Sequence, residues 1–299
     1  MISAMRTHDR QNFFKYVSAG TAISILTNRT LRWSSPVLFN DPFDVPRELS
    51  FGVTSDDLID ALIRRIANLI ENPPDDTSAL DPTTALIVES VKKNNSMKLK
   101  AELIDGLTDV ASSQRFTGES LDALRVMWKV WIPNFRILCF TESPDHVAMW
   151  YHYANQYSGV VLEFRCDDEH DSAWLLAKPV IYPKAKPDVY TAEGWARLLT
   201  MPQQLAINKI LDVSTLIKSQ DWSYEREWRI ISFKRADDIG LFTDYAFHQN
   251  ELSGIYLGPM ISESDREALT DLAKGYPRAA VWSVAIGMNR EFHFEAICD

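Results

Sequence analysis

The chain of 299 residues lacks the signals that would place it in a membrane or in an oxidising compartment. It has no run of about 20 apolar residues, as a membrane-spanning helix requires, and its N-terminus has no apolar stretch suited to a signal peptide. Its three cysteines, Cys139, Cys166 and Cys298, form no CxxC pair for zinc or redox chemistry. We therefore expect a soluble protein of the reducing cytoplasm.

Basic charge and the common nucleotide-binding motifs are also scarce. Lys and Arg number 31 against 41 Asp and Glu, which gives a formal net charge of −10. This balance argues against broad nonspecific attraction to nucleic acid, whose phosphates are held by Lys and Arg. The strings GxSxG, GxxxxGK[ST] and GxGxxG are absent, so a serine hydrolase, a P-loop enzyme and a Rossmann enzyme have no support. The hydrophobic content of 46% is sufficient for a full core.

Hydrophobic periodicity separates a helical segment from β-rich segments. From 53 to 131, apolar residues recur at helical intervals, as at Leu58, Leu62 and Ile66, and Ser55 fits an N-cap. On either side, runs such as FFKYV, LRWSS, FRILCF and VVLEFR are typical of strands. The order predicts a single α+β domain over 1–299, with a mixed, mainly antiparallel sheet and a helical insertion at 53–131.

The segment WSYEREWR at 222–229 has the most informative pattern in the chain. Aromatic and charged residues alternate with the period of two that is typical of a strand. Side chains two residues apart on a strand lie roughly 6.5 to 7 Å from one another. Glu225 and Glu227 therefore repel unless Arg229, a ligand or a proton compensates. The pattern fits either a site in a cleft or the solvated outer face of an edge strand.

Two other blocks combine polar and aromatic residues. In the loop WSSPVLFNDPFD at 33–44, Asp41 and Asp44 fit turn caps as well as ligands. In CFTESPDHVAMWYHY at 139–153, one helical face carries Trp150 and is typical of core, whereas His152 lies off that face. His152 is thus the better candidate for a functional histidine.

These blocks, in this order and after the KY of Lys15 and Tyr16, resemble a widespread bacterial domain family of unknown function. Its members carry KY near the start, an FNDPFD loop, a CFS-then-MWxHY block, a GxxxEF strand and a WxYExEWR strand. This chain departs mildly, with Thr141 where serine is usual. The resemblance names no reaction.

The order of parts is also similar, more distantly, to that of ADP-ribosyltransferases, including DNA-modifying toxins. Tyr16 on the first strand, the phrase SILTNRTL, the block at 139–151 and EWRII stand where those enzymes have corresponding parts. The better-known transferases have His or Arg on the first strand, where this chain has Lys15 and Tyr16. The resemblance implies an ADP-ribosyltransferase-like fold and an enzyme that uses NAD as its substrate, and a role in bacterial defence or as a toxin would fit that chemistry.

The resemblance also implies roles for particular residues. Glu227 would stabilise the oxocarbenium-like transition state, and Glu225 would orient or deprotonate the acceptor. The residues expected to bind NAD are Tyr16, Arg32, Ser34, Ser35, Asn40, Asp41, Trp150 and Arg229. Further candidates are His152, Tyr153, Glu163 and Tyr224. Nucleic acid, protein, a small molecule and water all stay open as acceptors.

Two alternatives remain at the level of sequence. Asp41 or Asp44 with Glu163 and Arg165 loosely resembles the Asp then Glu-x-Lys arrangement of Mg²⁺-dependent nucleases. The same blocks would also build the recognition pocket of a noncatalytic binding module. The sequence predicts no other metal site, and it does not indicate an oligomeric state.

Overall fold

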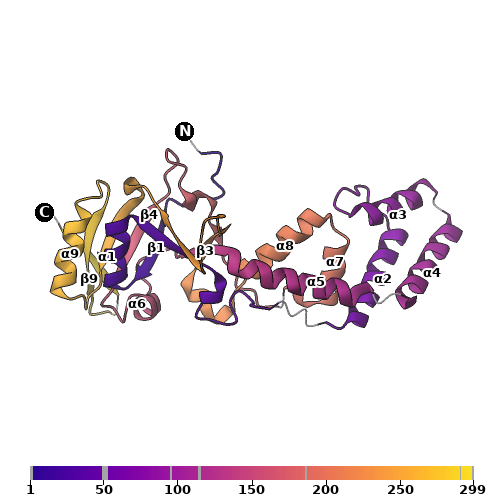
Figure 1. Cartoon of the computed structure of the whole chain (residues 1–299), viewed down its shortest axis with the longest axis horizontal. Helices are drawn as coiled ribbons and strands as arrows, with labels where there is room; N and C mark the ends of the chain where they lie inside the picture. The colour runs from indigo at the N-terminus through magenta and orange to yellow at the C-terminus, as the bar shows by residue number, and fades with distance from the viewer. Residues whose placement is uncertain are drawn as a thin grey trace. The chain divides into compact units, whose positions relative to one another are not determined.

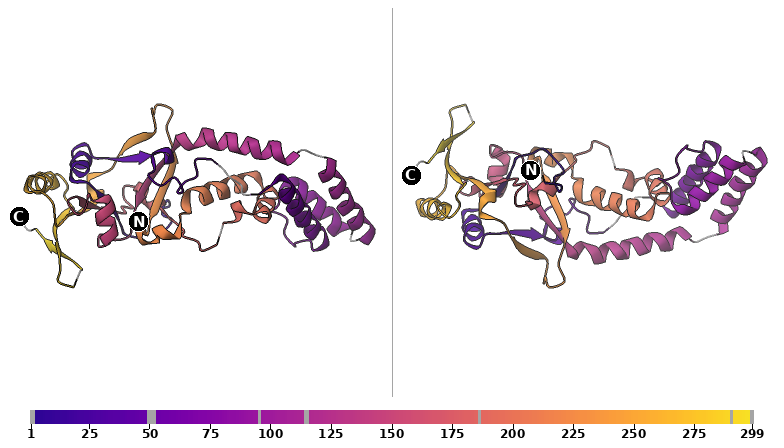
Figure 2. Two further views of the ribbon diagram at one scale, coloured as in Figure 1. Left: turned by 90° about the horizontal axis from the view of Figure 1, so that it is seen from below. Right: turned by 90° about the horizontal axis from the view of Figure 1, so that it is seen from above.

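The computed structural model describes residues 3–48, 53–94, 96–113, 116–185, 187–289 and 291–297. The chain forms two compact units, each built from segments that are far apart in the sequence, as the colours in Figures 1 and 2 show. The sheet unit comprises Met1–Asp41, Ile132–Tyr182 and Lys218–Asp299, and the helical unit comprises Pro42–Trp131 and Pro183–Ile217. No helix among the described residues combines the length and the apolar character needed to cross a membrane.

Sheet A is one of two five-stranded sheets found in the described part of the sheet unit. Its order is β1 (Asn12–Val17), β4 (Val160–Arg165), β8 (Leu252–Leu257), β9 (Ala280–Ile286) and β10 (Phe292–Ala296). Neighbouring strands are antiparallel, except that β8 and β9 are parallel. Helix α9 (Glu263–Ala273) connects this parallel pair, as a parallel connection requires.

Sheet B has the order β5 (Lys178–Pro179), β6 (Trp228–Phe233), β3 (Phe135–Phe140), β2 (Thr30–Ser34) and β7 (Phe242–Ala246). All its neighbouring strands are antiparallel. A single bridge between Phe14 and Thr141 joins the two sheets. The predicted α+β class and mainly antiparallel pairing are confirmed, although the strands form two sheets where one was expected.

One hydrophobic cluster unites the two sheets. Phe13 and Leu162 of sheet A and Leu138 of sheet B are fully buried in it. Helices α1 (Ala19–Asn28) and α9 lie side by side and add their apolar faces to the same cluster (Figure 1). On the opposite face of sheet A, α6 (Val147–Tyr153) packs through Met149 and Trp150 on Tyr16, Val161 and Tyr256.

Helix α6 ends in a short left-handed turn. Asn155, Gln156 and Tyr157 have φ values of 46°, 52° and 69°, a conformation that costs non-glycine residues about 1–2 kcal/mol each. The turn is held by the N–H of Gly258, which donates to the Gly159 carbonyl at 3.0 Å. A Cβ atom at position 258 would collide with the carbonyl oxygens of Tyr157 and Gly159, so the close approach requires glycine there.

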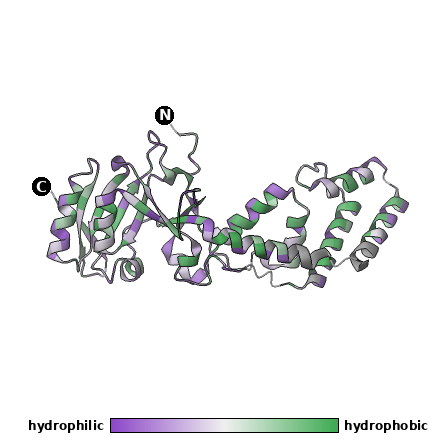
Figure 3. Ribbon diagram, in the orientation of Figure 1, coloured by the Kyte–Doolittle hydropathy of each residue, from purple (hydrophilic) through white to green (hydrophobic). Residues whose placement is uncertain are grey.

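The helical unit contains α2 (Ser55–Glu71), α3 (Pro82–Lys93), α4 (Met97–Ser113), α5 (Phe116–Trp131), α7 (Ala192–Leu199) and α8 (Gln203–Leu216). Its helices carry both hydrophobic and hydrophilic stretches (Figure 3). Leu58 of α2 packs on Trp195 and Leu198 of α7. The helices expected at 53–131 are therefore present, but the unit is wider than that insertion and includes 183–217. The N-cap of α2 is Thr54, in a capping box with Asp57, rather than Ser55.

Short 3₁₀ helices complete the described elements: η1 (Pro36–Leu38), η2 (Ile132–Asn134), η3 (Ala173–Leu176), η4 (Asp188–Tyr190), η5 (Gln220–Glu225) and η6 (Gln249–Glu251).

We predict that Gly258→Ala destabilises the protein by about 1–3 kcal/mol, because the added methyl group meets backbone atoms that cannot give way. Gly20→Ala is the matched control, since Gly20 lies in α1 and a methyl group added there would meet no atom within 4 Å. It should stabilise by up to about 1 kcal/mol through helix propensity. Urea unfolding measures both, and equal effects would contradict the close-approach argument.

Candidate functional site

The segment 222–229 forms a turn followed by a strand. Glu225 ends η5, Arg226 has a left-handed backbone with φ 44°, and β6 begins at Trp228. The prediction of one continuous strand was wrong, because Ser219 caps a 3₁₀ turn by accepting a hydrogen bond from the Asp221 N–H. The turn nevertheless brings both carboxylates, Glu225 and Glu227, to a common partner.

That partner is Lys218, which lies between the two glutamates. Its Nζ is 2.5 Å from Oε2 of Glu225 and 3.2 Å from Oε2 of Glu227. Arg229 binds Glu227 through two hydrogen bonds, from Nε to Oε1 and from Nη2 to Oε2, each 2.8 Å long. All four residues are at most 7% exposed. We call Lys218, Glu225, Glu227 and Arg229 the charged cluster; it balances two positive against two negative charges.

Hydroxyl groups from three other segments hold the two glutamates. Tyr153 Oη donates to Oε1 of Glu225 at 2.6 Å, and Thr141 Oγ1 donates to the carbonyl oxygen of Glu225 at 2.5 Å. The N–H of Glu227 donates to Tyr182 Oη at 3.0 Å. Ion pairs thus hold both carboxylates, a hydroxyl group also holds that of Glu225, and further hydroxyl groups hold the backbone of both glutamates.

Two aromatic rings cover the cations. The ammonium of Lys218 lies 5.1 Å from the centre of the Trp222 ring, and the guanidinium of Arg229 lies 5.5 Å from the centre of the Phe39 ring. Both distances are within the range of cation–π attraction. The loop that follows β2 therefore contributes to the charged cluster through Phe39.

One face of sheet B carries the base of the charged cluster. Cys139 of β3 pairs with Arg229 of β6, which pairs with Lys178 of β5, and paired residues share a face. Ile137, two residues before Cys139, pairs with Ser34 of β2. Ser34 and Arg229, both predicted to bind NAD, therefore lie on the same face of the sheet in neighbouring rows.

The pKa values of the two glutamates shift in opposite directions. Burial by itself raises the pKa of Glu227, but the charges and hydrogen bonds of Arg229, together with Lys218, lower it to about 2. Burial raises the pKa of Glu225, and the negative charge of Glu227 adds to the rise, against the opposing effect of Lys218. Glu227 therefore stays ionised over a wide pH range, whereas Glu225 binds a proton more readily than an ordinary glutamate.

Three aromatic residues that were predicted at the site pack instead in the hydrophobic cluster between α6 and sheet A: Tyr16, Trp150 and Tyr224. Tyr16 Oη donates to the Ser143 carbonyl at 3.0 Å and accepts from the His146 N–H at 3.1 Å. Trp150 Nε1 donates to the Pro144 carbonyl at 2.7 Å, and its ring meets Tyr16 edge-on. Tyr224 stacks on the ring of His146. Tyr16 and Trp150 are buried, so their rings serve as core in this structure.

The candidates near β2 have separate environments. Arg32 lies on the same face of sheet B as Ser34, two residues away, and forms an exposed two-bond ion pair with Asp244 at 2.9 and 3.0 Å. Ser35 is fully buried, caps η1 and donates to the Ile132 carbonyl at 2.8 Å. Asn40 is exposed and Asp41 is partly exposed. Arg32 and Ser35 therefore bind partners outside the charged cluster.

The remaining candidates are spread between the two units. Asp44 belongs to the helical unit, whereas Asp41 and Glu163 belong to the sheet unit. The carboxylate of Glu163 accepts a hydrogen bond from Tyr256 Oη at 2.9 Å, and burial raises its pKa. His152 is exposed, with its ring near those of Tyr151 and Tyr153.

Sequence reasoning missed Lys218, Tyr182, Lys15 and Cys139 as neighbours of the glutamates. Lys15 Nζ donates to the Cys139 carbonyl at 3.0 Å, and burial lowers the pKa of this lysine. Burial together with the nearby charge of Glu227 raises the pKa of the Cys139 thiol. Lys218 lies outside WSYEREWR and outside its alternating pattern, so no signal in the sequence pointed to it. Lys15 and Cys139, by contrast, belong to blocks that the sequence analysis had singled out.

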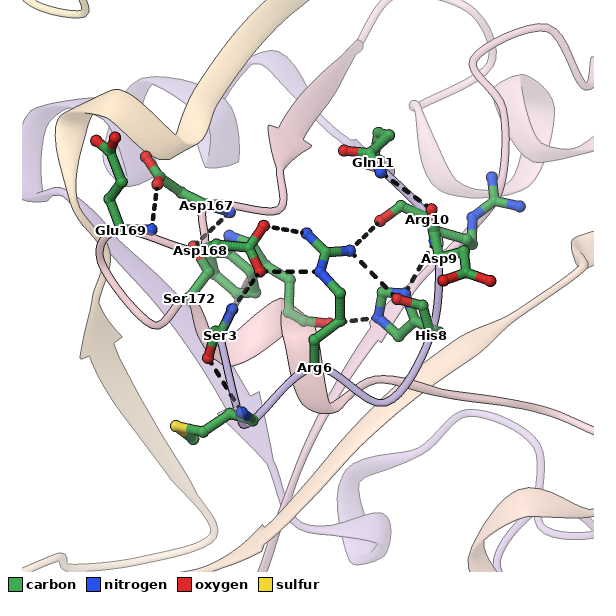
Figure 4. A network of polar contacts seen from close by, with 12 residues as sticks. Ser3, Arg6, His8, Asp9, Arg10, Gln11, Asp167, Asp168, Glu169 and Ser172 are labelled. Atoms are coloured by element: carbon green, nitrogen blue, oxygen red, sulfur yellow. Dashed lines mark hydrogen bonds and ion pairs between the residues drawn. The ribbon is translucent and has the colours of Figure 1, made fainter. Parts of the chain in front are cut away.

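A second polar network ties the N-terminal segment to the loop after β4 (Figure 4). Arg6 forms a two-bond ion pair with Asp168 at 2.9 and 2.7 Å, and the Ser3 N–H donates to the same carboxylate. Nearby, Asp167, Glu169 and His170 have ligand-type atoms within 4.8 Å of one another. Oδ2 of Asp167 already pairs with His170 at 3.1 Å and with Arg278 at 3.2 Å, so it has little capacity left for a metal. We regard this network as a structural tie.

We predict that Lys218→Met destabilises the protein by about 3–5 kcal/mol, because the buried carboxylate of Glu225 would lose its ion pair with Lys218 and that of Glu227 would keep its ion pair with Arg229 but lose the one with Lys218. The matched control is Lys274→Met in the exposed pair with Asp271, where the loss should be at most about 1 kcal/mol. Unfolding in urea compares the two variants. Similar losses would mean that the charged cluster is not the electrostatic centre of the sheet unit.

We also predict an acid-sensitive contribution from Glu227. Its pKa of about 2 lies below the ordinary value of 4.5. The stabilisation is therefore complete above about pH 5 and is lost as pH falls from there toward 2. Glu225, whose pKa is raised, acts in the opposite sense. Glu227→Gln should be less stable at pH 7 and should lose less stability between pH 5 and 2 than the parent protein does. Parallel pH curves from urea midpoints would assign the acid sensitivity to other groups.

The comparison with protein families matches residues 149–230 to the model of a family described as a protein of unknown function, DUF2971. No curated protein and no solved structure matches the chain. The matched range contains Tyr153, Tyr182 and all of the charged cluster. The chain is thus similar to this family of unknown function over the segment that supplies the site, in keeping with the family resemblance expected from the sequence.

Proposed function

We propose that this protein is an ADP-ribosyltransferase-like enzyme that cleaves the bond between nicotinamide and ribose in NAD and passes ADP-ribose to an acceptor or to water. One observation carries the proposal: two buried carboxylates, with pKa values shifted in opposite directions, converge on Lys218. Such a pair suits a reaction that needs one permanent negative charge and one proton acceptor.

Glu227 has the properties of the permanent charge. Cleavage of the glycosidic bond passes through a cationic, oxocarbenium-like transition state, which a preorganised carboxylate stabilises. With a pKa of about 2, Glu227 is ionised at neutral pH even though it is buried. Its orientation is fixed by Arg229 before any ligand arrives.

A ribose hydroxyl has a place to bind on Glu227. A carboxylate offers about four acceptor positions, and three are used by the hydrogen bonds from Arg229 and Lys218. The remaining position would accept a ribose hydroxyl without displacing either cation.

Glu225 has the properties of the proton acceptor. Its raised pKa favours uptake of a proton from an acceptor hydroxyl or from water. Tyr153, whose side chain is partly open to solvent, donates to Oε1 of Glu225. The tyrosine hydroxyl therefore offers a relay between the buried carboxylate and an incoming acceptor, of which nucleic acid is one class. A role in bacterial defence would fit such chemistry.

A noncatalytic binding module is the second candidate. The observation that favours it is that the two positive and two negative charges of the charged cluster already pair with one another. In that case the same residues shape a recognition surface, and the ion pairs keep the turn at Arg226 in place.

The test is nicotinamide release from NAD by the purified full chain. Glu227→Gln keeps the shape and removes the charge, so we expect turnover to fall at least about a hundredfold, which is the loss typical of one electrostatic stabiliser. Glu263→Gln, on the exposed side of α9, is the matched control and should keep full activity. A thermal melt of each variant shows whether it is folded.

Melting curves with NAD, ADP-ribose, nicotinamide and Mg²⁺ in separate samples distinguish the candidates, because a ligand that binds the folded state raises the melting temperature. Stabilisation by NAD with turnover supports the enzyme. Stabilisation without turnover supports the binding module. A response to Mg²⁺ alone would favour the nuclease alternative with Asp41 or Asp44 and Glu163. Full turnover by Glu227→Gln would remove Glu227 from the mechanism.

A further inference from the structure

Sheet A has one open edge. Its other edge strand, β1, continues toward sheet B through the bridge between Phe14 and Thr141. At the opposite end, β10 pairs with β9, and no strand in the described part of the chain pairs with its outer side. An unpaired strand edge is a template for another strand.

The backbone hydrogen bonds determine which residues face this open edge. The N–H of Gly287 donates to the Glu291 carbonyl at 2.8 Å, and the N–H of Ile297 donates to the Val281 carbonyl at 2.8 Å. Residues 291 and 297 are therefore turned toward β9, and in an antiparallel ladder the direction alternates along the strand. It follows that Phe292, Phe294 and Ala296 present their N–H and C=O groups to the open edge.

We propose that β10 pairs with β10 of a second copy of this chain, antiparallel and centred on Phe294. In this register Phe294 faces Phe294 of the second copy, and Phe292 faces Ala296. The outward N–H and C=O groups of all three residues then find partners. Centring the pair on Phe292 or on Ala296 would leave part of the strand unpaired.

The side chains favour the same register. His293 and Glu295 are exposed and share one face of the strand. Centring on Phe294 places His293 opposite Glu295 of the second copy, and by symmetry this happens twice. An imidazole that faces a carboxylate across strands is placed to donate a hydrogen bond to it, whereas like charges facing each other there are destabilising. His293 also lies 3.0 Å from Glu291, the residue before β10, which holds the imidazole on this face.

The other face of β10 is aromatic. Phe292 packs near Trp150 at a ring distance of 5.9 Å, and Phe294 packs near Tyr256 at 5.5 Å. In the pair, the two Phe294 rings would extend this aromatic layer from one copy to the next.

The chain has a net charge of −10, which opposes nonspecific association. The local match on β10 must therefore supply the attraction, and an interface of two short strands is smaller than stable interfaces of about 1,200–2,000 Å². We expect a reversible dimer that forms as concentration rises.

Sedimentation velocity of the full chain tests the pairing. The protein concentration should reach about 1 mM, so that a weak dimer with a dissociation constant of that order is detected. Ala296→Pro removes an outward N–H and leaves the bonds to β9 in place, as proline on an edge strand does. This variant should remain monomeric where the parent dimerises. A monomeric parent over the whole range, or unchanged dimerisation of Ala296→Pro, would overturn the proposal.

A charge exchange on exposed positions tests the register without touching the backbone. In the variant His293→Glu, the new carboxylate lies opposite Glu295 of the second copy. Because the two like charges repel, the dissociation constant of the dimer should rise at least about tenfold. Adding Glu295→Lys restores opposite charges and should bring the constant back toward that of the parent. Thermal melts check that all variants keep the parent fold. Failure of the second substitution to restore association would rule out this register.

Discussion

The sheet unit depends on one buried ammonium group, that of Lys218, between two carboxylates. Charged groups are stable in a protein interior only when they are paired and hydrogen-bonded. Lys218 pairs with Glu225 and with Glu227, and Arg229 supplies the second positive charge. Removing any one of these charges leaves the rest unbalanced, so the charged cluster acts as a unit.

The backbone places these charges with little help from regular structure. The N–H of Val180 donates to the Glu227 carbonyl at 2.8 Å, and the N–H of Lys218 donates to the Ile181 carbonyl at 3.1 Å. The short segment after β5 therefore positions both Lys218 and Glu227. Between the two glutamates, the left-handed backbone of Arg226 turns the chain from η5 into β6. Backbone strain of this kind is common at functional sites.

Several features were predictable because they depend on local patterns. The strands at FFKYV, FRILCF and VVLEFR follow from short β-branched and aromatic runs, and the helices of 53–131 follow from apolar spacing. Arg229 was one of three compensating groups that the sequence left open, beside a ligand and a proton, and in the structure it binds Glu227 through two hydrogen bonds. Alternating residues drew attention to Glu225 and Glu227, although the alternation itself did not reflect one strand.

Other features depend on tertiary contacts that leave no local pattern. A 3₁₀ helix separates Lys218 from Glu225, and the alternating aromatic residues had suggested a strand there instead. Tyr16 and Trp150 were expected to stack on a ligand, but aromatic residues in a sequence do not reveal whether they face a ligand or the core. Likewise, nothing in the sequence of the loop at 33–44 revealed that its Phe39 ring covers the guanidinium of Arg229.

The helical unit is assembled from two separate stretches of chain, and this has a consequence for folding during synthesis. Leu58 and Ala61 of α2 cannot find their partners on α7 until residues near 198 have been made. Lys218 is the first residue of the final segment of the sheet unit, so it emerges only after the last helical segment has been synthesised. The carboxylates follow it within a few residues. The buried charges therefore leave the ribosome nearly together, so that none of them is buried before its counter-charge has been made.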